Sequence, residues 1–121
     1  MLRRLALIAC LLAAPAAQAA PADAPFETRL FRLAEILGSL HYLRNLCGET
    51  GNQWRDQMEA ILTEEAPAAD KRARYIASFN RGYRSFSGIY AQCTDSAEEA
   101  IGRYMKEGEA LSHEIVVRFG N

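Results

Sequence analysis

Residues that usually carry chemistry are scarce in this sequence. Its 121 residues include two histidines and three cysteines, and the Cys-x-x-Cys, His-Glu-x-x-His and Cys-x-x-Cys-His spacings do not occur. A metal site needs three or four converging ligands, and the missing motifs also remove the signatures of thioredoxin-like exchange and covalently attached haem. His41 and His113 lie far apart in the chain. We therefore expect no metal ligands and no cofactor.

The sequence also lacks a phosphate-binding loop and an evident acid–base pair. Gly82 and Gly88 lie inside a helical pattern and not after a strand, so close approach of two helices explains them better than phosphate binding. The 15 acidic residues fall mainly on solvated faces, and no two of them form a clear catalytic couple. We expect no catalytic residue and no enzymatic activity.

Patterns typical of strands are missing as well. There is no alternating run long enough for a strand, no internal repeat and no low-complexity linker. Apolar residues recur instead at steps of three and four, the period of an amphipathic helix. With short connections between them, these segments predict an all-α fold, a small antiparallel four-helix bundle that follows a cleaved signal peptide.

The N-terminus has the three parts of a secretory signal peptide. Arg3 and Arg4 precede an apolar run over residues 5–14, and residues 17–19, Ala-Gln-Ala, supply a small-x-small cleavage site. The run is shorter than the roughly 20 residues that span a bilayer. We expect cleavage after residue 19, export to the periplasm and no transmembrane segment in the mature chain.

A second interpretation of the N-terminus is a lipoprotein. Residues 7–10, Leu-Ile-Ala-Cys, resemble a lipid-attachment box that would anchor the chain at Cys10. That arrangement would leave only residues 5–9 as the apolar core, whereas secretory cores usually have about 7–15 residues. The cleaved signal peptide is the interpretation we favour.

Removal of the signal peptide leaves an acidic chain with the size of one domain. The 14 basic residues lose Arg3 and Arg4 and become 12, against 15 acidic ones, so the net charge is −3. That charge favours neither nucleic acid nor an anionic membrane as a partner. The expected organisation is a signal peptide over 1–19, a flexible arm over 20–26 and a single helical domain over 27–121.

The clearest helical pattern lies within residues 76–93. Six apolar residues at steps of 3, 4, 3, 4 and 3 share one face, and basic residues occupy the opposite face. The six are Ile76, Phe79, Tyr83, Phe86, Tyr90 and Cys93. We expect Phe79, Tyr83 and Phe86 to lie in the core.

Capping and stop signals divide the chain into four helices. The first should span residues 27–47, and the second should begin after a cap at Asn52 and stop before Pro67. The third should begin within residues 67–71 and end near Gln92. The fourth should open with a capping box of Ser96 and Glu99 and close at Gly120. The first helix is apolar on most sides, so we expect it to be buried within its own domain or against a partner.

The two cysteines of the mature chain, Cys47 and Cys93, end the first and third helices. These helices point the same way in an up-down-up-down order, so both cysteines lie at one end. Cysteines in exported proteins usually pair, and closing a loop of about 46 residues would add roughly 4 kcal/mol of stability. We predict a disulfide; two free buried thiols are the alternative.

Two polar clusters are the candidate interaction residues. His41 and Arg44 lie on or beside the apolar face of the first helix, where an arginine must find a carboxylate, reach the surface or meet a partner. Glu49 and Glu65 are the carboxylates within reach. Arg81 and Arg84 lie on the third helix and could bind an acidic partner. A solvated basic face is the simpler interpretation of that second pair.

Three motifs carry a resemblance to a known family. They are LHYLR at residues 40–44, WRDQM at 54–58 and FNRGYRSF at 79–86. Together they resemble a family of short secreted alphaproteobacterial proteins of unknown function, with a domain of unknown function over most of the mature chain. The resemblance implies export and a single domain, and it implies no activity.

Three functions fit the sequence. The one we favour is a non-enzymatic interaction or structural module with a periplasmic or envelope protein as partner. The alternative is a binder of a small apolar or amphipathic ligand between helices, because aromatic residues are frequent in the third helix. An enzyme would need acid–base groups gathered around His41 or Arg44. The sequence sets neither the partner's identity nor the oligomeric state.

Overall fold

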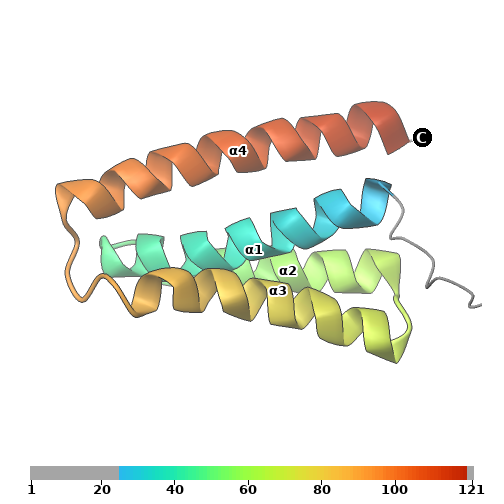
Figure 1. Cartoon of the computed structure of the whole chain (residues 1–121), viewed down its shortest axis with the longest axis horizontal. Coiled ribbons are helices and arrows are strands. Elements are labelled where there is room, and N and C mark those ends of the chain that lie inside the picture. Colours follow the sequence, from blue (N-terminus) through green and yellow to red (C-terminus); the bar gives the residue numbers. More distant parts are fainter. Residues whose placement is uncertain (1–24, 120–121) are drawn as a thin grey trace, which may run out of the picture.

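The computed structural model describes residues 25–119, and this part of the chain consists of four helices without a strand. They are α1 (Pro25–Leu46), α2 (Gln53–Glu65), α3 (Ala69–Ser87) and α4 (Asp95–Phe119). In Figure 1, α1 and α3 run one way and α2 and α4 run the other. The predicted all-α fold with four helices is confirmed. The signal peptide, Cys10 and Gly120 lie outside the described residues.

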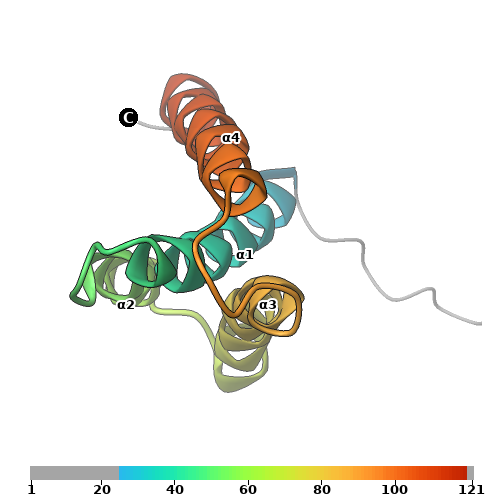
Figure 2. The same ribbon diagram turned by 90° about the vertical axis from the view of Figure 1, so that its left-hand side faces the viewer.

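Helix α1 is the centre of the arrangement. Figure 2, viewed along the helices, shows α2, α3 and α4 placed around it, and α1 packs against each of them. Its residues Ala34, Ile36 and Leu43 are fully buried. The other helices of the same chain therefore cover the broad apolar surface predicted for this segment. None of the four helices is long and apolar enough to cross a membrane.

Helices α1 and α3 approach each other through two glycines. A Cβ added at Gly82 would lie 1.9 Å from the Glu35 carbonyl oxygen, and one added at Gly38 would lie 1.9 Å from the Phe79 carbonyl oxygen. The Ser39 hydroxyl, which is buried between the helices, lies 3.1 Å from the carbonyl oxygens of both Glu35 and Gly82. Only glycine permits this contact, so the prediction of close helix approach is confirmed for Gly82.

The same prediction is wrong for Gly88. This glycine follows the last residue of α3, and a Cβ there would meet only the Arg84 carbonyl oxygen, at 3.6 Å. Its neighbours leave room for a side chain, so Gly88 marks the end of a helix and takes no part in helix packing.

The buried face of α3 differs from the predicted apolar stripe. It consists of Tyr75, Ser78, Phe79 and Gly82. Phe79 is 5% exposed, as expected, but Tyr83 is 38% exposed and Phe86 is only half-buried. Because Ser78 and Gly82 are small enough to meet the backbone of α1, the helix turns this face inward and moves Tyr83 toward solvent. The prediction that Tyr83 is a core residue is wrong.

Two of the predicted helix boundaries need correction. Helix α3 ends at Ser87 and not near Gln92, so Tyr90 and Cys93 lie in the connection to α4 and not on the stripe. The predicted capping box of α4 does not form, because the hydroxyl of Thr94 accepts the hydrogen bond from the Ala97 backbone N–H at 3.1 Å. The connection between α3 and α4 therefore begins earlier in the chain than the apolar pattern indicated.

The boundaries near α1 and α2 are close to those predicted. Helix α1 begins at Pro25, two residues earlier than expected, and it ends one residue before Cys47. The side chain of Asn52 makes no capping bond, and its carbonyl oxygen accepts from the Asp56 N–H at 2.7 Å instead.

The predicted disulfide between Cys47 and Cys93 is present, with the two Cα atoms 5.0 Å apart. Cys47 follows α1 directly, whereas Cys93 lies in the α3–α4 connection. The Tyr42 hydroxyl donates a hydrogen bond to the Tyr90 carbonyl oxygen and holds the same connection. Both links fix the start of α4 against the end of α1.

The glycine contact generates a direct stability test. In Gly82→Ala the new methyl group must push α1 and α3 apart, and overpacking of this kind costs about 1–3 kcal/mol. The matched control is Gly102→Ala, because a Cβ at Gly102 meets nothing within 4 Å. Alanine there should stabilise the exposed helix by about 0.5–1 kcal/mol. Urea unfolding of both variants measures the difference, and equal stability of the two would contradict the close contact.

Candidate functional site

A mostly apolar groove of about 270 Å³ runs along α1 between α2 and α4. It exists because α2 and α4 both pack against α1 but not against each other. Apolar side chains of α1 form the floor, and one wall comes from α2 and one from α4. The floor consists of Leu33, Ile36, Leu37 and Leu40, and the walls are Trp54, Gln57, Met105, Gly108, Glu109 and Ser112.

The α2 wall of the groove is held by a carboxylate. The indole N–H of Trp54 donates to Glu49 Oε1 at 2.9 Å, and Gln53 donates to the same oxygen. Arg44 Nε donates to Glu49 Oε2 at 2.6 Å, and its guanidinium lies 5.8 Å from the centre of the Trp54 ring. Glu49 therefore connects the end of α1 to the first turn of α2 and sets the position of Trp54.

Arg44 thus finds one of its two candidate partners, Glu49, while Glu65 lies at the other end of α2. Both members of the pair are only partly exposed. The hydrogen bond from Arg44 is the main reason why the pKa of Glu49 lies below its ordinary value. The interpretation of Arg44 as a structural ion pair is supported, and the arginine also serves the groove by fixing its tryptophan.

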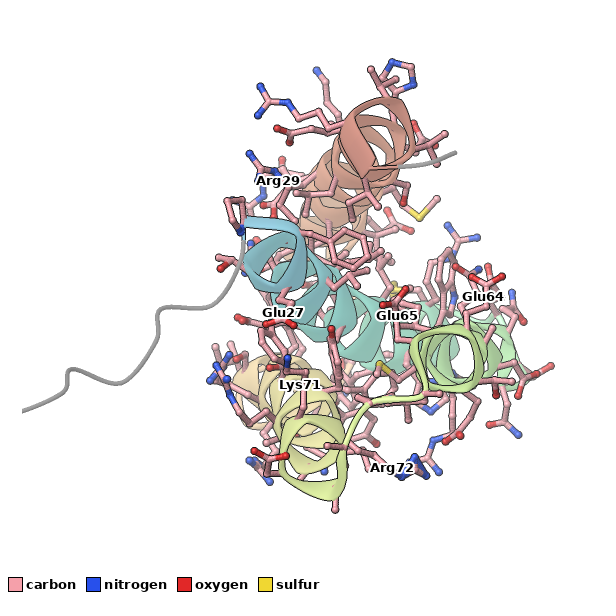
Figure 3. The ribbon with its side chains drawn as sticks, turned by 90° about the vertical axis from the view of Figure 1, so that its right-hand side faces the viewer. Glu27, Arg29, Glu64, Glu65, Lys71 and Arg72 are labelled. Atoms are coloured by element: carbon pink, nitrogen blue, oxygen red, sulfur yellow. A yellow bond between two sulfur atoms is a disulfide. The ribbon has the colours of Figure 1, made fainter. Side chains whose placement is uncertain are left out.

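Glutamates occur in the α4 wall of the groove and at the end of α2 beyond its α2 wall. Glu109 belongs to the α4 wall, and Glu64 and Glu65 lie at the end of α2, about two helical turns beyond Gln57; in Figure 3 both extend from the upper side of α2, with Glu65 nearer to α1. All three side chains are exposed. None of the residues that line the groove is basic. The groove therefore combines an apolar floor with an acidic rim.

His41 lies outside this groove, on the side of α1 that faces α3. Its ring centre is 5.9 Å from the ring centres of Phe79 and Tyr83. Desolvation, and to a smaller extent the charge of Arg55, lowers the pKa of His41. A polar hollow of about 330 Å³ adjoins it, lined also by Asn45.

Arg81 lines a different hollow, of about 400 Å³, between α1 and α3. Its guanidinium lies 3.2 Å from Glu35, which also pairs with Arg32 at 3.2 Å. Arg32 in turn makes two hydrogen bonds to Glu107 of α4, at 2.5 and 2.8 Å, and these bonds raise the pKa of Arg32 and lower that of Glu107. Arg81 is thus the exposed end of an ion-pair network that joins α4, α1 and α3.

Arg84 is exposed on α3 and lines none of these hollows. The structure therefore does not bring the four candidate interaction residues together. His41, Arg44 and Arg81 border three separate hollows. Within residues 25–119, no group of three or more His, Cys, Asp or Glu residues could hold a metal ion.

The walls of the groove were missed by sequence reasoning. Met105, Glu109 and Ser112 follow one another at steps of four and three, so they share one flank of α4. That flank lies beside the apolar stripe and mixes apolar with polar residues. Its spacing was visible in the sequence, but nothing in the sequence showed that α2 would leave it uncovered.

Comparison with known proteins places the described part of the chain in a family. A family model described as "Protein of unknown function (DUF2385)" matches residues 25–119. Neither the curated proteins nor the solved structures give a match to this chain.

The Arg44–Glu49 pair can be tested by a double-mutant comparison. Arg44→Ala leaves Glu49 without its cation and should cost about 1 kcal/mol, between the values for buried and exposed charged hydrogen bonds. Arg44→Met combined with Glu49→Gln should stay within about 0.5 kcal/mol of the native protein, because no charge is left unpaired. Arg81→Ala is the control, since its pair with Glu35 is mostly exposed, and its cost should stay below about 0.5 kcal/mol. Equal losses for Arg44→Ala and Arg81→Ala would contradict a structural role for the Arg44 pair.

The lowered pKa of Glu49 predicts a pH dependence of stability. A carboxyl whose pKa is lower in the folded than in the unfolded state stabilises the fold above the unfolded value, here the ordinary 4.5. This contribution is lost as the pH falls through the folded value. The difference in unfolding free energy between the native protein and Glu49→Gln should therefore be constant above pH 4.5 and shrink below it. Urea unfolding over a pH series measures that difference, and a constant difference down to about pH 3 would show that Arg44 does not hold the carboxylate.

Proposed function

Because the chain belongs to the DUF2385 family of proteins of unknown function, we propose its function from its structure. It is an exported, non-enzymatic helical module that binds a protein partner by taking an apolar side chain of that partner into the α2–α4 groove. The observation that carries this function is the groove itself, in which mostly buried apolar side chains of α1 form the floor between a wall from α2 and a wall from α4 that do not pack against each other.

The size of the groove favours a side chain over a whole ligand. Pockets that enclose small molecules usually have volumes of about 300–1,000 Å³, and the groove measures about 270 Å³. A partner that inserts one large apolar side chain gains the burial energy of an anchor residue, as in helix-in-groove recognition. Trp54 and Met105 stand on opposite walls, where they can contact such an anchor from both sides.

The distribution of the titratable residues supports a non-enzymatic role. Acid–base catalysis needs a donor and an acceptor within hydrogen-bond reach of one reacting atom. Of the acidic and histidine residues with shifted pKa values, Glu49, Glu107 and Glu114 are engaged by arginines, and His41 borders a hollow of its own. These groups stabilise helix contacts and do not converge on the groove.

Export is supported by the sequence and by the disulfide. The signal-peptide pattern predicts secretion to the periplasm, and disulfides persist in that compartment but are rare in the cytosol. The Cys47–Cys93 bridge fits this assignment. A secreted module also benefits from the bridge because its core is small.

A small apolar ligand is the second candidate occupant, because the groove floor consists of leucine and isoleucine side chains. Native mass spectrometry of protein purified from its own periplasm separates the two candidates. A retained small molecule, lost on mutation of Met105, would favour the ligand over the protein partner.

Photo-crosslinking tests the proposed function. A photoreactive phenylalanine analogue at Ser112, which lines the groove and is exposed, should give a defined protein adduct in the periplasm. The same analogue at Lys106, exposed on another face of α4, is the matched control and should give none. Introducing Met105→Ala should abolish the Ser112 adduct while the melting temperature stays within a few degrees. Equal adducts at both positions, or none at Ser112, would contradict partner binding through the groove.

A further inference from the structure

The carboxylates of the groove rim have no partner within the described part of the chain. Glu64, Glu65 and Glu109 make none of the ion pairs in residues 25–119, whereas Glu27, Glu107 and Glu114 each pair with a basic side chain. Figure 3 shows the difference for α1 and α2, because Glu27 points toward Lys71 while Glu64 and Glu65 extend beside the open face of α2. Negative charge thus remains uncompensated on both sides of the groove.

The apolar part of the groove continues along α4. Val116 follows Met105, Glu109 and Ser112 at the next step of four, so it lies on the same flank. Its side chain is 67% exposed. On α2, the half-buried Ile61 follows Trp54 by seven residues, two helical turns. The groove, Ile61 and Val116 together form an apolar strip several turns long, with a mostly buried floor and half-buried or exposed walls, and glutamates lie along its sides.

A strip of this form matches one kind of partner. A helix presents apolar residues at i, i+3, i+4 and i+7 along one face, and its flanking positions lie on both sides of that face. Lysine or arginine at the flanks would reach Glu109 on one side and Glu64 and Glu65 on the other. An acidic flank would instead place like charges opposite each other, which disfavours binding.

We propose that the α2–α4 groove binds a basic amphipathic helix of another protein, with apolar residues on the groove floor and cationic residues against Glu64, Glu65 and Glu109. This inference rests on the proposed function and specifies the partner's chemistry. Recognition by charge sets the choice of partner, while the apolar anchor supplies most of the affinity.

Two designed peptides test the inference. Both have about 18 residues, enough to form a helix, with leucine at i, i+3, i+4 and i+7; one carries lysine at the other positions and its twin carries glutamate. The protein has one tryptophan, Trp54, in the groove wall, so its fluorescence reports occupancy directly when the peptides lack tryptophan. The basic peptide should bind at least about tenfold more tightly than the acidic twin at low salt, and the ratio should fall at high salt because the charges are exposed.

Two double variants that remove the same charge test whether the rim glutamates cause the tighter binding of the basic peptide. Glu64→Gln with Glu65→Gln should weaken binding of the basic peptide about fivefold. Glu59→Gln with Glu99→Gln removes the same charge from exposed positions on the outer faces of α2 and α4, and it should change binding by less than about twofold. Circular dichroism and the melting temperature confirm that both variants are folded.

The outcomes separate the two proposals. If both peptides shift Trp54 emission with equal affinity, the groove binds helices but the basic partner is wrong. If neither peptide shifts the emission, the proposed function fails and this inference fails with it.

If the outer-face control weakens binding as much as the rim variant, the net charge of the protein and not the rim attracts the peptide, which overturns the inference. A protein dimer in sedimentation that excludes the basic peptide from the groove would assign the groove to a second copy and also overturn it.

Discussion

The close contact between α1 and α3 is the constraint on which the rest of the structure depends. Gly38 and Gly82 each leave no room for a Cβ, and the Ser39 hydroxyl shares its hydrogen bond between carbonyl oxygens of both helices. Because protein interiors are close-packed, two backbones this near each other fix the rotation of both helices about their axes. That rotation turns Tyr75 and Phe79 inward and leaves the remaining apolar surface of α1 to be covered by α2 and α4.

The groove is a consequence of this arrangement. The apolar surface of α1 extends around much of its circumference. Helices α2 and α4 therefore pack on different sides of α1 and do not contact each other. Two links then fix the walls, the Arg44–Glu49–Trp54 contacts at the start of α2 and the Cys47–Cys93 bridge before α4. The floor and walls of the groove are formed by helix residues.

The candidate site could be predicted only in part. Local reasoning gave Glu49 and Glu65 as the candidate partners of Arg44, because an arginine on an apolar face requires a carboxylate, and the structure selects Glu49. The same reasoning also selected Arg81, whose partner Glu35 lies on another helix and was not identified. The groove was missed because its floor and two walls come from α1, α2 and α4. Periodicity assigns each residue to a face of its own helix but does not state which faces meet.

The sequence by itself determined the helices, their order and the end at which the two cysteines meet. Apolar spacing and turn residues act locally and define each helix, and the alternating direction of successive helices places both cysteines at one end. The sequence also determined that the first helix would be buried. The tertiary structure alone decided which face of α3 is inside, since two small residues, Ser78 and Gly82, are buried where the pattern favoured Ile76 and Tyr83. It alone decided that α2 and α4 remain apart. Both outcomes depend on how closely backbones approach, a property of pairs of helices that hydrophobic spacing within one helix does not contain.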